Sequence, residues 1–361
     1  MLIVPDVITP AWAWAKRAFS LSEFRPPDVQ VDIVAEPECS NQMVRDYDAV
    51  VTMGWMSGPV GPNCWGQVAN IGAMFSYAPL STNFLQRCAS RSKNREAALS
   101  RLRRFRGVLN INPDQQLQDF LTSCNPNTHL MPTGVGSVFL DTPLFRELTP
   151  KTSRRVRVPK VVSRTRDTEA LNNSFGLPNR AGGERFRIGW CGKPCKNGRW
   201  TPKGYEHVLL PLMANLRDEQ FIEFDINTRD ITESPLNDQE LIAWYDSLDL
   251  FLVTSSTEGT PSVLLEAGAR GVPAISTAVG VTAPLANNNA CILVPPYRDE
   301  DGARETVRKM TTTIRALCHP TPPNFTTRHP LVVMGDAMRL AVESLHNWRT
   351  VAPVWFRTIL Q

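Results

Sequence analysis

Two glutamates separated by seven residues, Glu258 and Glu266, are the pair in this sequence best suited to chemistry. Glu258 lies in a polar loop with Gly259 and Thr260, and Glu266 lies just beyond Pro261. Pro261 suits the first position of a helix, whose free N–H groups and positive dipole end attract anions. Two carboxylates beside such a helix start would repel a bare phosphate. They fit a ligand that carries phosphate and hydroxyl groups together, as a nucleotide sugar does.

A strand, a tight loop and a helix must position this pair. Residues 248–254 form an apolar run that is short enough to be a buried strand. After Pro261, the side chains of Val263, Leu264 and Ala267 fall on one stripe of a helix. One carboxylate is therefore expected in the loop and the other one turn into the helix.

The sequence S-S-T-E-G-T-P-S-V-L-L-E-A-G-A-R-G-V-P at residues 255–273 resembles the E-x7-E signature of retaining GT-B glycosyltransferases of the GT4-like group, the glycosyl transferases group 1. Residues 245–249, 271–277 and 279–280 resemble the family's flanking segments, and the resemblance is dense from about residue 188 to 294. It implies an α/β protein of GT-B fold, with two Rossmann-like parallel-sheet domains facing each other across a cleft. In the alternative, Glu258 caps the helix and Glu266 is a solvated surface residue.

Lys193 and Lys203 follow a strand end and precede a helix start, respectively. Cations at two such positions can converge on one anion. With Gly192 and Gly204, they resemble the family's G-R/K and K-G pair, which meets the donor diphosphate. The alternative is that both lysines are solvated.

The resemblance also implies a role for each residue of the motif. Glu258 would hold the sugar hydroxyls, Glu266 the ribose diol, and the lysines the diphosphate, with retention at the anomeric carbon. We expect a UDP-linked sugar as co-substrate and neither a metal nor another cofactor. The expected catalytic residues are Glu258, Lys193 and Lys203, and the expected donor-binding residues are Gly192, Gly259, Thr260, Pro261, Ser262 and Glu266.

At 361 residues the chain is long enough for two domains. Strand and helix patterns alternate, which favours parallel sheets with ligands at the carboxyl ends of the strands. We expect an acceptor domain at residues 1–165, a donor domain at 166–345 and a terminal helix at 346–361 that crosses back to the first domain. Expected strands lie at residues 2–7, 29–35, 49–53, 108–112, 187–193, 221–227, 248–254 and 271–277, and expected helices at 11–24, 95–105, 114–121, 206–216, 237–246, 299–317 and 332–345, with one more helix beginning at Pro261.

Three tryptophans of the first domain are candidates for the acceptor side. Trp12, Trp14 and Trp55 would form an aromatic platform for a sugar or a base, or else belong to the core. The family often has a Gly-Gly loop and a histidine in this domain. This chain instead has residues 9–14, T-P-A-W-A-W, and His129, which we interpret as a structural strand residue.

The positive charge is concentrated in the first half of the chain. Residues 1–181 hold 21 Lys and Arg against 15 Asp and Glu, a net charge of +6, with basic stretches at 87–106 and 151–166. Both stretches would serve a large anionic acceptor, for example hydroxymethylated bases in DNA that are flipped out of the duplex. A lipid or glycan acceptor and a simple solvated surface remain alternatives.

Other patterns narrow the class of protein. No run of eighteen apolar residues is present, so we expect no membrane span, while contact with a membrane surface stays open. We expect no signal peptide and a cytoplasmic protein with reduced thiols, because its eight cysteines are scattered. Asp46-Tyr47-Asp48 matches a metal-binding D-x-D, but it precedes a strand and is interpreted as a turn.

Two other functions compete with glycosyl transfer. A nucleotide-sugar epimerase on the same scaffold would need acid and base groups around the sugar, and the first domain is poor in histidine. A non-catalytic binding module would have little use for the intact glutamate pair and both lysines.

Overall fold

The computed structural model describes residues 1–5, 13–53, 70–74, 100, 102–103, 105–144, 185–192, 194, 202–219, 221–228, 236–318 and 330–361. These residues form two compact units. The first comprises Met1–Ser137, Glu258–Pro261 and Ser344–Gln361, and the second comprises Val138–Thr257 and Ser262–Glu343. The domain boundary expected at residue 165 and the basic stretch at 151–166 lie outside the described residues.

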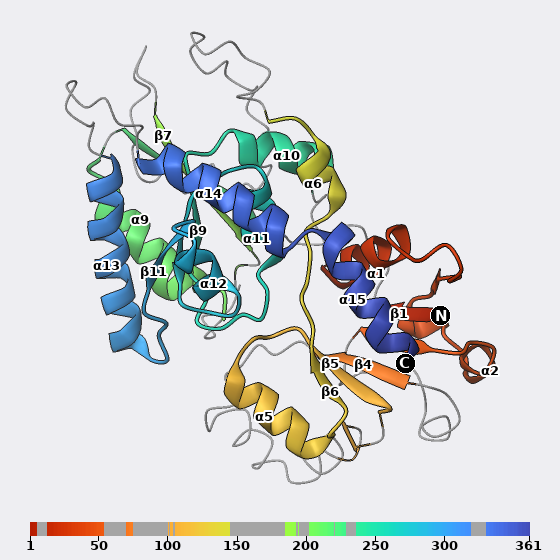
Figure 1. Cartoon of the computed structure of the whole chain (residues 1–361). Helices are drawn as coiled ribbons and strands as arrows, with labels where there is room; N and C mark the ends of the chain where they lie inside the picture. The colour runs from red at the N-terminus through yellow and green to blue at the C-terminus, as the bar shows by residue number, and fades with distance from the viewer. Residues whose placement is uncertain are drawn as a thin grey trace. The chain divides into compact units, whose positions relative to one another are not determined.

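The first unit contains a sheet in which all neighbouring strands are parallel (Figure 1). Within the described residues its strand order is β2-β1-β3-β4-β5-β6. The strands are β1 (Leu2–Pro5), β2 (Asp32–Ile33), β3 (Val50–Met53), β4 (Asn70–Met74), β5 (Gly107–Asn110) and β6 (Thr128–Leu130). The sequence did not predict β4, because its residues N-I-G-A-M include asparagine, glycine and alanine, which strands disfavour.

Helices of the first unit begin at polar caps. The Asp114 carboxylate accepts a hydrogen bond from the Leu117 N–H, and the Ser40 hydroxyl accepts one from the Met43 N–H. The helical elements are α1 (Ala13–Glu23), η1 (Glu36–Glu38), α2 (Asn41–Arg45), α5 (Gln115–Cys124) and α15 (Trp348–Leu360). The short helix α6 (Ser137–Asp141) belongs to the second unit from Val138 onward.

The C-terminal helix α15 belongs to the core of the first unit, where it lies beside α1 (Figure 1). Trp355 Nε1 donates to the Pro132 carbonyl at 2.6 Å, and His346 Nδ1 lies 2.8 Å from the Thr133 carbonyl. Burial lowers the pKa of His346, so the ring is neutral and its Nδ1–H donates. At Gly134 an added Cβ would lie 2.7 Å from Trp348 Cγ, which leaves no room for a side chain.

The second unit contains another all-parallel sheet, with the strand order β11-β10-β9-β7-β8 among the described residues. Its strands are β7 (Phe186–Gly192), β8 (Ile222–Thr228), β9 (Leu250–Val253), β10 (Ala274–Thr277) and β11 (Cys291–Val294). Its helices are η2 (Tyr205–Leu209), α9 (Leu210–Leu216), α10 (Asp238–Asp246), α11 (Ser262–Ala269), α12 (Thr282–Asn287), α13 (Glu300–Cys318) and α14 (Pro330–Leu345).

Two helix starts in the second unit follow from local chemistry. Asn237 and Glu240 form a capping box, in which each side chain accepts the other residue's backbone N–H, so the helix expected at Asn237 is confirmed. The helix expected at 206–216 begins instead with a π-helical turn, in which the Leu209 N–H donates to the Gly204 carbonyl. Pro211, which follows, has no N–H to offer.

Close backbone approach and a buried ion pair fix the helices around α11. A Cβ on Gly335 of α14 would lie 2.3 Å from the Gly271 carbonyl oxygen. The buried Arg270 guanidinium makes two 2.8 Å hydrogen bonds to the Asp246 carboxylate. It also donates to three carbonyl oxygens at the end of α6, those of Phe139, Thr142 and Pro143. Arg270 therefore ties α6 and α10 to the end of α11.

Candidate functional site

The strand order of the second unit marks one place as the expected ligand site. The chain runs outward from β7 to β8 on one side and from β9 to β10 and β11 on the other, so the direction reverses between β7 and β9. In open sheets of this kind, ligands bind outside the carboxyl ends of the strands at the reversal point. Those ends are Gly192 and Val253, which are followed by the two loops that the sequence singled out.

Buried hydrogen bonds join the loop after β9 to the loop before η2. Thr254 Oγ1 donates to the Lys203 carbonyl at 2.7 Å and accepts from Trp190 Nε1 at 2.9 Å. The Thr254 carbonyl accepts from Tyr297 Oη at 2.9 Å. The Ser256 N–H donates to the Pro202 carbonyl at 2.7 Å. We call this set of residues the Thr254 network: Trp190, Pro202, Lys203, Thr254, Ser256 and Tyr297.

Gly204 lies inside the Thr254 network. Its φ of 69° is in the left-handed region, and an added Cβ would lie 2.1 Å from the Thr254 carbonyl oxygen and 2.3 Å from Tyr297 Oη. Burial raises the pKa of Tyr297, which keeps its hydroxyl a hydrogen-bond donor. The Lys203-Gly204 pair that the sequence indicated therefore contacts the carboxyl end of β9.

The end of β10 is fixed in the same manner. Thr277 Oγ1 donates to the Ser255 carbonyl at 2.5 Å. Thr282 Oγ1 accepts from the Val279 N–H at 2.9 Å and donates to the Thr277 carbonyl at 3.3 Å. Thr277 and Thr282 are fully buried. Buried hydroxyls thus hold the loops after β9 and β10 by their backbones.

Glu266 lies in α11 and is only 2% exposed, so it is not the solvated surface residue of the alternative interpretation. Tyr245 Oη, on α10, donates to Glu266 Oε2 at 2.9 Å. The sequence did not predict this partner. Its only signal was that Tyr245 lies in a segment resembling the family's approach to β9.

The segment Glu258–Pro261 groups with the first unit. Glu258 is buried, Thr260 Oγ1 donates to the Ile111 carbonyl at 3.0 Å, and Arg17 Nη2 donates to the Thr260 carbonyl at 3.3 Å. The Arg17 guanidinium also lies over the Trp14 ring, 4.9 Å from its centroid. Two hydrogen bonds therefore hold the backbone and the hydroxyl of Thr260.

Several expected site residues fall elsewhere. Trp14 is 8% exposed and belongs to the core of the first unit, which favours the core interpretation. Trp12, Trp55 and Lys193 lie outside the described residues, as does most of the basic stretch at 87–106. Pro261 directly precedes α11, which begins at Ser262.

The remaining candidates are structural. His129 is an exposed residue of β6 whose Nε2 lies 2.7 Å from Asn127 Oδ1. Asp46 and Asp48 lie in the turn between α2 and β3, as the sequence indicated.

No helix in the described part of the chain is long and apolar enough to cross a membrane. The described residues also contain no cluster of three or more His, Cys, Asp or Glu side chains suited to a metal ion.

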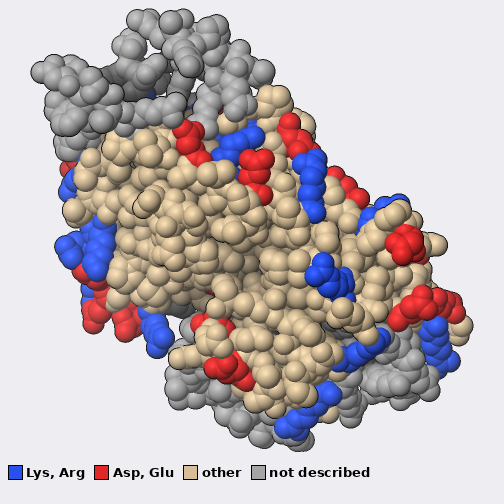
Figure 2. Space-filling model, in the orientation of Figure 1, with Lys and Arg blue, Asp and Glu red and all other residues tan. Residues whose placement is uncertain are grey.

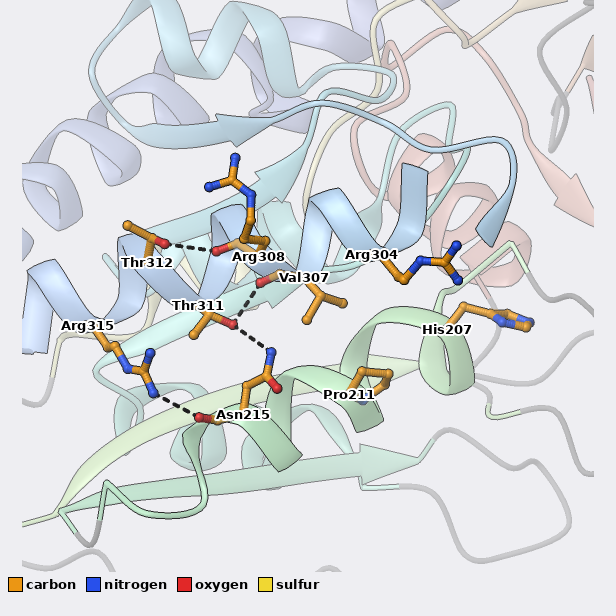
Figure 3. Close-up of a pocket in the computed structure, with 9 residues that line it drawn as sticks. All are labelled: His207, Pro211, Asn215, Arg304, Val307, Arg308, Thr311, Thr312 and Arg315. Atoms are coloured by element: carbon orange, nitrogen blue, oxygen red, sulfur yellow. Dashed lines mark hydrogen bonds between the residues drawn. The ribbon is translucent and has the colours of Figure 1, made fainter. Parts of the chain in front are cut away.

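A concave region, which we call the α13 groove, lies between α13 and the η2–α9 segment (Figure 3). Its volume is about 600 Å³. Asn215 Nδ2 lies 3.5 Å from Thr311 Oγ1, and Arg315 Nη2 donates to the Asn215 carbonyl at 3.0 Å. The lining residues are His207, Pro211, Asn215, Arg304, Val307, Arg308, Thr311, Thr312 and Arg315.

Each arginine of the α13 groove has a carboxylate partner. Arg308 makes two 2.7 Å hydrogen bonds to Glu305, which lower the pKa of Glu305 to about 2, and its guanidinium extends away from α9 (Figure 3). Arg304 pairs with Asp301, and Arg315 with Glu219. Figure 2 shows the two charge types side by side at the left edge of the view, where Figure 1 places α13. The groove is therefore a charge-balanced helix surface.

Comparison with known proteins gives a family match over part of the chain and a shared fold over nearly all of it. Residues 231–313 match the family model of the glycosyl transferases group 1. No curated protein sequence matches the chain. The family match covers the segment from just before α10 to the middle of α13, including the loop with Glu258 and the whole of α11.

Solved structures similar to this one cover nearly the whole chain. A sucrose-phosphate synthase from Thermosynechococcus elongatus has a TM-score of 0.59 at 16% identity, covering 99% of this chain and 97% of that one. The Anabaena protein HepE in complex with UDP-glucose has a TM-score of 0.59 at 13% identity, covering 99% of each chain. WaaG, a glycosyltransferase involved in lipopolysaccharide biosynthesis, has a TM-score of 0.54 at 14% identity, and the match also covers 99% of each chain. At these identities the likeness shows a shared fold, and it confirms the fold that the sequence predicted.

Proposed function

We propose that this chain, a glycosyltransferase of the GT-B fold, transfers a sugar from a UDP-linked donor to an acceptor hydroxyl, with retention at the anomeric carbon and without a metal. The enzyme class rests on the family match at residues 231–313. The UDP-linked donor is supported by HepE, a structural neighbour that was solved in complex with UDP-glucose. The retaining mechanism and the GT4-like assignment rest on the E-x7-E resemblance.

The observation that carries the proposal is the Thr254 network at the strand-order reversal. It holds the backbone of Lys203 against the carboxyl end of β9 through a 2.7 Å hydrogen bond from Thr254. In the proposal, the Lys203 ammonium neutralises the diphosphate as its bond to the sugar C1 breaks. Lys193 and the N–H groups at the start of α11 would share this charge. Preorganised charge of this kind is usually the largest contribution to catalysis.

The two glutamates take different parts of the donor in this proposal. Glu266, with two carboxylate oxygens, accepts hydrogen bonds from the two adjacent ribose hydroxyls. Glu258 and the backbone of Gly259 and Thr260 hold the sugar hydroxyls. Gly192, Pro261 and Ser262 complete the donor site, and the transition state resembles an oxocarbenium ion.

The acceptor we propose is a large anionic one, a hydroxymethylated base in DNA, and its support is the net charge of +6 over residues 1–181. The base would have to be flipped out of the duplex to reach the donor. The cytoplasm is the proposed location, since reduced thiols are typical of it. The described cysteines are all free thiols: Cys39, Cys124, Cys191, Cys291 and Cys318.

The donor is tested by measuring hydrolysis of a panel of nucleotide sugars without acceptor. We expect one UDP-sugar to be hydrolysed, and Glu258→Ala to lower turnover at saturating donor by about a hundredfold or more. Glu305→Gln, on the exposed face of α13, is the matched control and should leave turnover unchanged. Unchanged turnover in Glu258→Ala would contradict the role of Glu258, and accumulation of an epimerised nucleotide sugar would identify an epimerase instead.

The acceptor is tested by transfer of label from the donor found in that panel. Single-stranded and duplex DNA containing 5-hydroxymethylcytosine are compared with unmodified DNA, anionic vesicles and a polyanionic glycan. We expect transfer to the modified DNA and binding to it that weakens steeply as salt is added. Transfer to lipid or glycan alone would replace DNA as the acceptor and leave the donor assignment intact.

A further inference from the structure

We infer that Tyr245 is a positioning residue that makes the donor site selective for ribose over deoxyribose. Its hydroxyl orients the carboxylate of Glu266, to which the proposed function assigns the ribose diol, so the inference rests on that function. The observation is a buried hydrogen bond between two neighbouring helices. Tyr245 Oη on α10 lies 2.9 Å from Glu266 Oε2 on α11, and the two residues are 0% and 2% exposed.

The Tyr245 ring is confined by aromatic neighbours. Its centroid lies 4.9 Å from that of Trp244, 5.8 Å from Phe251 and 6.2 Å from Phe139, each in an edge-on arrangement. Trp244 is held in turn by its Nε1, which donates to Asp225 Oδ1 at 3.0 Å. A fully buried ring in such a cage has one position, so the direction of its O–H toward Glu266 is fixed.

A phenol suits this task better than a cation would. Hydrogen bonds to a charged acceptor are stronger than neutral ones, and an ionised carboxylate offers about four lone-pair sites. The Tyr245 phenol makes a single hydrogen bond to Oε2 and so orients the Glu266 carboxylate for hydroxyl donors. An arginine at this position would compete with the ligand for both oxygens.

The chemistry of the ligand follows from this geometry. A carboxylate fixed on one side presents its oxygens in a set direction, and two adjacent hydroxyls can donate to it together. A deoxyribose lacks a hydroxyl that would donate to this carboxylate, and losing a hydrogen bond to a buried charged acceptor is costly. Tyr245 therefore contributes to the discrimination between nucleoside and deoxynucleoside diphosphates.

The test compares two ligands that differ only in the ribose hydroxyls. Affinities for UDP and for 2′,3′-dideoxy-UDP are measured by calorimetry on the full chain and on Tyr245→Phe, which keeps the ring. We expect Tyr245→Phe to weaken UDP binding about tenfold and dideoxy-UDP binding less than about twofold. In a Glu266→Gln background, Tyr245→Phe should cause no further loss for either ligand.

Tyr47→Phe is the matched control, since it removes another tyrosine–carboxylate hydrogen bond, from Tyr47 Oη to Asp32 Oδ2 at 2.9 Å in the first unit. It should leave both affinities unchanged. An equal loss for UDP and dideoxy-UDP in Tyr245→Phe, or no loss, would overturn the inference while the donor assignment stands. If the unmodified chain binds no nucleoside diphosphate, whether of uracil, guanine, adenine or thymine, the proposed function fails and the inference with it.

Discussion

The Thr254 network and the α13 groove both belong to the second unit, and they are built in opposite ways. The network consists of buried hydroxyls and a ring N–H, most of them directed at backbone carbonyls, as between Tyr297 and Thr254. The groove consists of exposed guanidinium groups matched with carboxylates, as between Arg308 and Glu305. In the network, directional hydrogen bonds fix the position of the backbone. In the groove, opposite charges balance each other at an exposed surface.

This difference predicts unequal contributions of the two regions to stability. A buried donor or acceptor left without its partner costs about 1–3 kcal/mol, so the network fixes loop positions firmly. Exposed ion pairs contribute about 0–1 kcal/mol, and salt screens them. The four substitutions below test this contrast.

The largest effect is expected from Gly204→Ala, in the Thr254 network. The new Cβ would lie 2.1 Å from the Thr254 carbonyl oxygen, at a φ of 69° that alanine disfavours. The free energy of unfolding should fall by roughly 3 kcal/mol or more, as measured by urea denaturation, and donor hydrolysis should be lost. The control is Gly302→Ala in α13, where the nearest atom would be 3.1 Å away and the change should stay within about 1 kcal/mol. Equal effects at the two sites would break the comparison.

Thr254→Val should have the next largest effect. It removes the acceptor of Trp190 Nε1, in a buried hydrogen bond, and the donor to the Lys203 carbonyl, in a partly buried one. We expect a loss of about 2 kcal/mol in the free energy of unfolding. Thr312→Val removes an exposed hydroxyl that donates to the Arg308 carbonyl of its own helix, and it should change stability by less than about 0.5 kcal/mol. A larger loss in Thr312→Val than in Thr254→Val would reverse our interpretation.

Alkaline pH tests the network through Tyr297. Burial raises its folded pKa above the unfolded value of about 10, so the unfolded chain loses this proton first. Its stabilising contribution is complete below pH 10 and declines as pH rises beyond it. Tyr297→Phe should be less stable at pH 8, by about 1 kcal/mol, but its stability should decline less between about pH 10 and 11.5. Burial also raises the pKa of Cys291, to about 12, in both proteins, so that effect cancels in the difference. If the stability of the two proteins declined in parallel over this pH range, the hydrogen bond from Tyr297 to the Thr254 carbonyl would be excluded.

Acid pH tests the groove through Glu305, and here we expect the smallest effect. Arg308 lowers the folded pKa of Glu305 to about 2, below an unfolded value of about 4.3. The contribution is present above pH 4.3 and is lost as pH falls toward 2. Glu305→Gln should match the unmodified chain at pH 7 in high salt and should lose less stability between about pH 4.5 and 2.5. A large destabilisation at pH 7 would show that the groove is more than a balanced surface.

Much of the fold follows from local patterns in the sequence. Apolar runs with strand–helix alternation predicted strands that overlap β1–β3, β5 and β7–β10, and the Asn237 cap predicted the start of α10. The π turn before Pro211 and the strand β4 were missed. Because β4 has little strand preference of its own, it forms through its pairing with β3 and β5 on either side.

The candidate site also combines features that nearby residues determine with contacts that only the tertiary structure determines. The sequence by itself determined the glutamate spacing and the Lys203-Gly204 pair, because each of these depends on residues a few positions apart. It predicted the start of α11 one residue early, at Pro261 instead of Ser262. Only the tertiary structure decided which groups hold them. Tyr245 is 21 residues from Glu266, and Thr254 is 43 residues from Tyr297, 51 from Lys203 and 64 from Trp190. Such partners meet because β7 lies between β8 and β9 in the sheet and pairs with both. This strand order is a property of the packed sheet, and no local sequence pattern encodes it.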